Sequence, residues 1–389
     1  MSPDLSARDP HSEKTPPPQD LLDGDRRGSL GRVLAVVSPR RFSGVYLFIA
    51  LIIFFSFATP EFFTLVTLKS VAAEQAITAI VALGLMVALA AGVFDLSVSG
   101  VMGLANILVA EFMVSFGLPI VEAILLTLLI GAFIGLVNGI IVIKFRIDPF
   151  IATLGTQSIL FALVLLFSHQ ENILGVPPSF ISIATDEVLG IPAPVIYLFV
   201  LALGIWYVLQ WTPVGRRLYA TGGSREVARL AGVRTSTYVV CSFVVSATIA
   251  SAAGILVVAT IGSGSTQVGP NYLLPAFAAG FLGATQFQPG RFNVWGTVLA
   301  VYLLATGVQG LTLMGASSWV AQMFDGLALI VAVGISGFQR RARVKKQQGI
   351  PRRDSGHVTG MESFDHGAES VQSTPTSTTP PLEALGGSL

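Results

Sequence analysis

Long apolar blocks recur along this chain, and they constrain its fold more than any other feature of the sequence. A helix of about 20 residues, at about 1.5 Å per residue, spans the roughly 30 Å hydrocarbon core of a bilayer. Every backbone polar group in lipid has to be paired within the protein, which leaves only helices or a closed barrel. The blocks lack the apolar-polar alternation of barrel strands. We therefore predict an all-α polytopic membrane protein.

About ten transmembrane helices are expected. The predicted spans are residues 43–58, 71–91, 94–115, 120–143, 149–168, 193–211, 238–261, 272–284, 292–314 and 318–338. The composition agrees, because 52% of the residues are hydrophobic and only 12% are charged, which is unusual for a soluble domain. The first block begins behind a long polar segment, so it is not a cleavable signal peptide. Glycines such as Gly131, Gly135 and Gly139 are expected to allow close contact between helices.

Basic residues are distributed unequally between the two sides of these spans. If the N-terminus is cytoplasmic, every Lys and Arg except Lys69 lies on the cytoplasmic side, as the positive-inside rule requires. Both termini are then cytoplasmic in an inner membrane. Residues 169–192, which contain acidic residues but no Lys or Arg, form an extracytoplasmic loop that could dock a partner. Two quartets of spans enter the membrane from opposite sides, which permits inverted four-helix repeats.

The two ends of the chain differ from the region between them. Residues 1–41 and 341–389 are rich in Ser, Thr, Pro, Gly and charge, so they lack the apolar surface that would offset the entropy of ordering. We expect two disordered cytoplasmic tails around a transmembrane domain at 42–340. The net charge is +1 and the basic residues form short clusters, so no nucleic-acid partner is indicated.

Three stretches resemble motifs of a known transporter family. Residues 92–100, GVFDLSVSG, resemble the Gly-Gly-Ile-Asp-Leu-Ser-Val-Gly motif of the ribose, xylose, arabinose and galactoside ABC permeases, with Val93 in place of the second Gly. Residues 135–139, GLVNG, and 147–155, IDPFIATLG, are similar to two further motifs in the family's order. Residues 215–232 resemble the cytoplasmic segment that these permeases present to their ATPase, with Ser224 where Asn is usual. The resemblance covers roughly residues 45–340.

The resemblance implies a permease subunit that translocates a sugar or sugar-like solute by alternating access. It also implies three protein partners: a second permease subunit, identical or pseudosymmetric, a cytoplasmic ABC ATPase and an extracytoplasmic solute-binding protein. The chain has no Gly-x-x-x-x-Gly-Lys-Ser/Thr loop that would cradle phosphates. ATP and Mg²⁺ are therefore expected on the partner, and this chain is expected to be a transport subunit without enzymatic activity or a cofactor of its own.

The central loop, residues 212–237, is predicted to couple the chain to its ATPase. Gly222 and Gly223 form a turn, Ser224 caps a short helix, and Gly232 ends it. An apolar stripe on this helix, beside two arginines four residues apart, suits insertion into a cleft on a cytoplasmic partner. The alternative is a solvated basic loop that only fixes the topology. The predicted coupling residues are Gly215, Gly222, Gly223, Ser224, Arg225, Glu226, Arg229, Leu230 and Gly232.

Polar side chains within the predicted spans are candidates for the solute pathway. Asp95, Ser99 and Asn106 share one face of the third span, although Asp95 could instead cap the following helix by accepting the amide hydrogen of Ser97. Neutral hydrogen-bonding groups beside aromatic rings suit a sugar, but such groups also hold helices together, at about 0.6 kcal/mol per bond. The candidates are Asp95, Ser99, Asn106, Thr153, Gln157, Phe161, Tyr302, Thr306, Gln309, Gln322 and Asp325.

Two other classes of function are considered. In an ion-coupled secondary transporter, Asp95 and Asp325 would bind the coupling ion, but the predicted spans contain no Lys, Arg or His to join them. An intramembrane enzyme is disfavoured, because all histidines lie outside the spans and no paired acidic metal motif is present. The motifs leave the solute open among ribose, other pentoses, hexoses, inositol and nucleosides.

Overall fold

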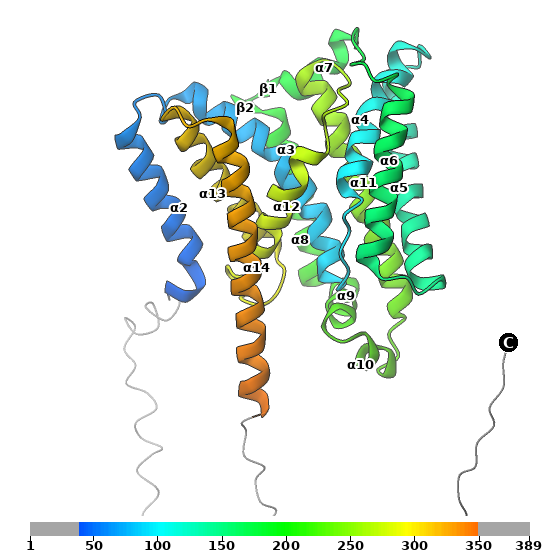
Figure 1. Cartoon of the computed structure of the whole chain (residues 1–389), viewed down its shortest axis with the longest axis vertical. Coiled ribbons are helices and arrows are strands. Elements are labelled where there is room, and N and C mark those ends of the chain that lie inside the picture. Colours follow the sequence, from blue (N-terminus) through cyan, green and yellow to red (C-terminus); the bar gives the residue numbers. More distant parts are fainter. Residues whose placement is uncertain (1–38, 349–389) are drawn as a thin grey trace, which may run out of the picture. The chain divides into compact units, whose positions relative to one another are not determined.

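The computed structural model describes residues 39–348, so most of the two predicted disordered tails lies outside the described residues. Contacts within the chain group residues 1–344 into one unit and 345–389 into another, and of the second unit only the end of the last helix is described. The described part is almost entirely helical, as predicted (Figure 1).

Every predicted span falls on a helix. The helices are α2 (Pro39–Ala58), α3 (Leu65–Ala90), α4 (Val98–Val114), α5 (Ile120–Lys144), α6 (Pro149–Phe167), α7 (Pro178–Thr185), α8 (Ala193–Trp211), α9 (Pro213–Gly223), α10 (Arg225–Leu230), α11 (Thr235–Ile261), α12 (Pro270–Gly283), α13 (Val294–Leu313) and α14 (Ser318–Gln348). Two short antiparallel strands, β1 (Glu187–Val188) and β2 (Ile191–Pro192), lie between α7 and α8. The last helix continues past residue 338, where the predicted span ends.

The helices differ in their capacity to cross a membrane. By length and composition, 6 helices among the described residues are long and apolar enough: α3, α5, α6, α8, α11 and α13. The apolar parts of α2, α4 and α14 are shorter, and α12 has 14 residues with Pro275 inside it. Ten membrane crossings therefore remain a prediction.

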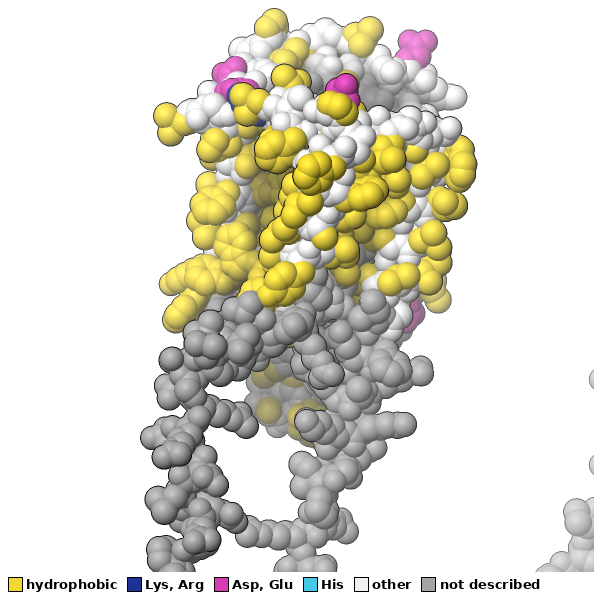
Figure 2. Space-filling view, turned by 90° about the vertical axis from the view of Figure 1, so that its left-hand side faces the viewer, with side chains coloured by type: hydrophobic (Ala, Val, Ile, Leu, Met, Phe, Trp, Pro, Cys, Tyr) yellow, Lys and Arg dark blue, Asp and Glu magenta, His cyan; other side chains and the backbone are white. Residues whose placement is uncertain are grey.

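Three helices form the centre of the bundle. The second half of α3 is buried on all sides, and so are nearly all of α4 and much of α11. Small residues bring α5 against α11, as predicted, because a Cβ added at Gly135 would lie 2.8 Å from the Cβ of Ala247, and one at Gly139 would lie 2.9 Å from the Cα of Val240. The outer helices carry exposed Leu, Ile, Val and Phe side chains, and Figure 2 shows such apolar side chains covering one face of the molecule.

Two central helices are followed by non-helical stretches inside the bundle. Residues 91–97, the first break, separate α3 from α4, and residues 262–269, the second break, separate α11 from α12. Phe94 of the first break stacks on Phe277 and Phe281 of α12, while Gly269 of the second break lies against the backbone of Ser99 in α4. Each break thus packs against the helix that follows the other break.

The packing of whole helices has the same correspondence. Helix α4 packs on α11 as α12 packs on α3, and α3 packs on α13 as α11 packs on α5. This is the pairing that an inverted repeat of α3–α6 and α11–α14 produces. The discontinuous pairs α3/α4 and α11/α12 are the equivalent elements of the two quartets.

The connections between helices divide between two sides of the bundle. On one side, which we call the α7 side, Ile173 pairs with Gly264 of the second break, and the Lys69 ammonium lies 2.6 Å from the Glu187 carboxylate. On the opposite side, the α10 side, α9 and α10 lie beneath the ends of α5 and α11 (Figure 1). Lys69 therefore shares a side with residues 169–192, as the distribution of basic residues predicts.

Candidate coupling segment and solute pathway

The segment between α8 and α11 folds into two short helices rather than one. The sequence predicted a turn at Gly222 and Gly223, but both residues end the helix α9. The reason lies at the start of that helix, where Pro213 occupies the first turn and the Thr212 hydroxyl accepts a hydrogen bond from the amide of Gly215. Leu218 is buried in the middle of α9 and ties the helix to the bundle.

The next helix, α10, has the predicted ends and an exposed apolar face. The Ser224 hydroxyl accepts a hydrogen bond from the amide of Val227, and Gly232 adopts a left-handed φ of 81° beyond the last turn. Ala228 is buried, whereas Val227 is 65% exposed and Leu230 is 80% exposed. Arg225, Glu226 and Arg229 are also exposed. A short, firmly capped helix thus presents two aliphatic side chains and two arginines away from the chain.

Helix α9 contacts the loop before α13 through Tyr219. Its hydroxyl donates a hydrogen bond of 2.6 Å to the carbonyl oxygen of Phe292, and the Arg291 guanidinium lies 3.7 Å above its ring. Burial raises the pKa of the Tyr219 hydroxyl above its usual value, and the positive charge of Arg291 partly opposes this shift. The hydroxyl therefore stays protonated and keeps its donor hydrogen at physiological pH.

Asp95 in the first break is 1% exposed and belongs to a buried series of hydrogen bonds. Its Oδ1 accepts from the amide of Ser97 at 3.1 Å and from the Ser97 hydroxyl at 2.5 Å. The Ser97 hydroxyl accepts from the Asn138 amide group at 2.9 Å, and the Asn138 carbonyl oxygen accepts from the Thr156 hydroxyl at 2.6 Å. We call Asp95, Ser97, Asn138 and Thr156 the polar chain. It joins the first break to α5 and α6. The predicted bond from the Ser97 amide to Asp95 is present, but it lies within the break, because the helix begins at Val98 and its N-cap residue Ser97 makes no side-chain cap bond.

Two other pathway candidates also make structural contacts. The Thr153 hydroxyl on α6 accepts a hydrogen bond from the amide of Leu96 at 3.1 Å. The Asn106 amide group donates to the carbonyl oxygen of Gly254 at 3.3 Å, and its carbonyl oxygen accepts from the amide of Ser265 at 2.7 Å. Ser99 is buried, and its hydroxyl has no hydrogen-bond partner among residues 39–348. Asp95, Asn106 and Thr153 thus connect helices to the two breaks.

The remaining pathway candidates lie in separate places. Tyr302 donates a hydrogen bond to the carbonyl oxygen of Ala72, and with Thr306 and Gln309 it lines a cavity of about 200 Å³ between α2, α3 and α13. Gln157 and Phe161 on α6 are partly buried, and Gln322 on α14 is exposed. The predicted residues therefore do not converge on one pathway.

Asp325 lines a different cavity, of about 330 Å³, between α3 and helices α11 to α14. Its polar lining residues are Glu74, Gln75, Thr78, Thr260, Asn271, Tyr272 and Asp325. The described residues around this cavity include two carboxylates but no Lys, Arg or His. We call it the polar cavity. Sequence analysis missed most of these residues, although Glu74 offered a signal as an acidic residue inside the predicted span 71–91.

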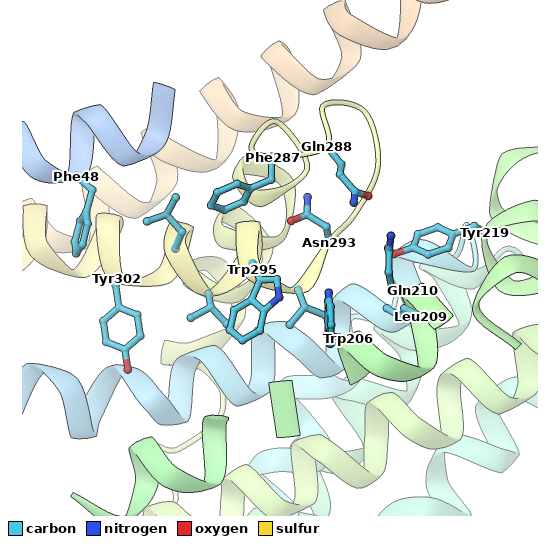
Figure 3. A pocket seen from close by; sticks show the side chains of 13 residues that line it. Phe48, Trp206, Leu209, Gln210, Tyr219, Phe287, Gln288, Asn293, Trp295 and Tyr302 are labelled. Carbon is cyan, nitrogen blue, oxygen red and sulfur yellow. The ribbon is translucent and has the colours of Figure 1, made fainter. Parts of the chain in front are cut away.

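A larger cavity, of about 620 Å³, is lined mainly by aromatic and aliphatic side chains of α2, α8 and α13, and we call it the aromatic cavity. Trp206 and Trp295 lie in its middle, Phe48 and Tyr302 at one end, and Tyr219 at the other (Figure 3). Among the polar groups, Gln210 lies beside Tyr219, whereas Asn293 lies near the two tryptophans (Figure 3). This lining offers fewer hydrogen-bonding side chains for its size than the lining of the polar cavity.

Comparisons with known proteins assign the chain to a family. Residues 67–333 match the family described as "Branched-chain amino acid transport system / permease component". The ribose import permease protein RbsC of Haemophilus influenzae is 33% identical over 309 residues, which cover 78% of this chain and 94% of that protein. RbsC of Bacillus subtilis is 33% identical over 317 residues, covering 81% of this chain and 97% of that protein.

A third relative is named for a different solute. The D-allose transport system permease protein AlsC of Escherichia coli is 26% identical over 294 residues, covering 75% of this chain and 90% of that protein. No solved structure matches the chain. The match over most of the bundle, its apolar helices and the near-complete coverage of two ribose permeases agree with one another. The chain is therefore a multi-pass inner-membrane protein that belongs to this family of transport-system permease components.

Proposed function

We propose that this chain is the membrane-spanning subunit of an ABC importer and translocates a sugar or sugar-like solute by alternating access. The observation that carries the proposal is the match to two ribose import permeases over nearly their whole length. The family description mentions branched-chain amino acids, but the ribose and allose permeases favour a hydroxylated solute.

The polar cavity supports a hydroxylated solute on chemical grounds. Carboxylates such as Glu74 and Asp325 accept hydrogen bonds from hydroxyl groups, and the side-chain amides of Gln75 and Asn271 both donate and accept. The Tyr272 ring adds an apolar face on which a sugar ring can pack. The two acidic side chains could pair with the ammonium group of an amino acid, but no basic side chain in the described lining would pair with its carboxylate, whereas a neutral sugar needs no such partner.

The exposed face of α10 supports a cytoplasmic ATPase as partner. Leu230 and Val227 project from a helix whose only buried residue is Ala228, and a desolvated contact with a partner would bury them favourably. Together with the positive-inside distribution, this supports a cytoplasmic position for the α10 side and an extracytoplasmic position for residues 169–192, where a solute-binding protein would dock. ATP and Mg²⁺ would bind to the ATPase, and a second permease subunit would complete the complex.

The test is uptake by proteoliposomes that contain this chain, its ABC ATPase partner and the matching solute-binding protein. We expect labelled ribose or a related sugar to accumulate with internal ATP and not with an imposed proton or sodium gradient alone. Accumulation driven by the ion gradient without ATP would instead establish an ion-coupled secondary transporter. Uptake of leucine but of no sugar would refute the solute class.

A pair of variants tests the polar cavity. Asn271→Leu removes an amide from the cavity lining, so we expect the sugar concentration for half-maximal uptake to rise about tenfold, the loss of one or two hydrogen bonds. Gln288→Leu is the matched control, because Gln288 lines the aromatic cavity instead. Equal uptake parameters for the two variants would remove the solute from the polar cavity.

A further inference from the structure

We propose that the contact between Gly222 and Gly92, continued by the polar chain, transmits movement of the coupling segment to α6, with Asp95 as a positioning residue. This inference rests on the proposed function, because it assumes that an ATPase moves α10. It assigns a role to a buried acidic residue that lines neither the polar cavity nor the aromatic cavity.

The first step runs from α10 to α9. Helix α10 packs on α9 and on the start of α11, whereas α9 packs on α3, α8 and α11. Because α10 has only one buried residue, Ala228, a force on its exposed face reaches the bundle mainly through α9. Helix α9 therefore has to shift when α10 shifts.

The second step runs from α9 to the first break, through backbone atoms. A Cβ added at Gly222 would lie 2.9 Å from the amide nitrogen of Gly92 and would also overlap the carbonyl oxygen of Ala90. Gly92 itself has a φ of 80°, a left-handed conformation that favours glycine. Two glycine backbones in contact have no side chain that could change rotamer and absorb a displacement. Movement at the end of α9 is thus passed on to the first break.

The third step runs from the first break to α6. Asp95 and Ser97 follow Gly92 closely in the chain, and their hydrogen bonds continue through Asn138 to Thr156. The bond from Leu96 to Thr153 adds a second attachment of the break to α6. Because Asp95, Ser97 and Asn138 are buried, breaking one of their bonds leaves polar groups unpaired in an apolar interior, which is unfavourable. The polar chain therefore moves as a unit with the break.

Helix α6 is suited to respond, because it is held on few sides. It packs mainly on α4 and α5, and its residues Leu154, Gly155 and Ser158 are exposed on the face that points away from them. A shift of the break can thus change the position of α6 without disturbing the core around α3 and α11.

Adjacent glycines provide a matched pair of variants. A Cβ at Gly222 meets the backbone of the first break, whereas one at Gly223 meets nothing within 4 Å. In proteoliposomes with the ATPase and binding protein, solute uptake and ATP hydrolysis are both measured for each variant. We expect the amount of solute transported per ATP to fall about tenfold in Gly222→Ala, while Gly223→Ala stays within about twofold of the wild type.

A second pair tests the polar chain. Thr156→Val removes the hydroxyl that donates a hydrogen bond to the Asn138 carbonyl oxygen. Thr127→Val is the control, because among residues 39–348 its buried hydroxyl bonds only within its own helix, to the carbonyl oxygen of Ala123. We expect a fall in solute per ATP for Thr156→Val alone. If the Gly222–Gly92 contact and the polar chain act in series, the double variant Gly222→Ala, Thr156→Val transports solute per ATP within about twofold of the worse single variant. If they act independently, the two reductions in solute per ATP multiply.

Three results would overturn the inference. The first is that Gly222→Ala and Gly223→Ala transport the same amount of solute per ATP. The second is that the two reductions multiply in the double variant. The third is that Gly222→Ala alone loses ATPase copurification, which would make the contact a requirement for assembly. A merely structural role would lower hydrolysis and uptake together and leave their ratio unchanged. Failure of the wild-type chain to bind an ATPase or to use ATP would refute the proposed function instead, before any variant is compared.

Discussion

Replacement of Leu230 by Asp is the most direct perturbation of the proposed ATPase contact. Leu230 is 80% exposed in this chain, so its substitution removes almost no contact within the chain. A surface change of this kind alters the free energy of unfolding by less than about 0.5 kcal/mol. The membrane fold should therefore survive the substitution.

The expected loss of binding free energy follows from the burial that the Leu230 side chain would lose in a complex with the ATPase. Full burial of a leucine side chain contributes about 1.5–3 kcal/mol, and most of that side chain is available for a partner. An Asp in the same cleft adds an uncompensated charge, which costs several kcal/mol more. At about 1.4 kcal/mol per tenfold change, the dissociation constant of the ATPase should rise by about three orders of magnitude or more.

The assay is copurification of the ATPase with the permease, and solute uptake, at matched membrane levels. Leu189→Asp is the control, because Leu189 is 98% exposed in the turn between β1 and β2, on the α7 side of the bundle. It introduces the same charge at an equally exposed leucine. Normal copurification and uptake for Leu230→Asp would refute the coupling role and leave a loop that only fixes the topology.

Three further outcomes are expected. Asn106→Leu should lower the unfolding temperature measured in detergent, because the loss of both its hydrogen bonds leaves buried backbone groups unpaired at about 1–3 kcal/mol; an unchanged temperature would contradict this. Burial raises the pKa of Tyr219, so the stability that its neutral hydroxyl provides should be complete below about pH 10 and decline above it. Tyr219→Phe should abolish that alkaline decline, and an identical pH profile would contradict the assignment. In a Cys241→Ser background, which removes an exposed thiol, Leu189→Cys should react with an impermeant maleimide in intact spheroplasts and Leu230→Cys only after permeabilisation; the reverse pattern would invert the topology.

The helices could be predicted from the sequence because the length and continuous apolar character of each block are enough to indicate a membrane helix. The capped helix at α10 could be predicted for the same reason, since Ser224 and Gly232 lie at its two ends. Helix α9 was missed because it is short, polar and contains Gly222 and Gly223, which usually indicate a turn. Its helical state depends on the cap at Thr212 and on the burial of Leu218 against the bundle.

The partners of buried polar groups could be predicted only where they are close in sequence. The contact of Asp95 with Ser97 is local and was expected, whereas Asn138 and Thr156 reach the same site from other helices. Tyr302 shows the limit of face-sharing arguments, because its hydroxyl bonds a backbone carbonyl of α3 instead of opening onto the polar cavity. Which polar residues meet in a bundle depends on packing between helices, which periodicity along one helix does not determine.

The two contacts of α9 bear on how one helix can act on both halves of the bundle. Gly222 touches the first break, which belongs to the quartet α3–α6, and Tyr219 bonds to Phe292, which precedes α13 in the quartet α11–α14. The two attachments are connected, because Phe292 packs on Phe281 and Phe281 stacks on Phe94 of the first break. A displacement of α9 therefore acts on both quartets at once. Because each break packs against the helix that follows the other break, a displacement that reaches α6 through the first break also reaches α12.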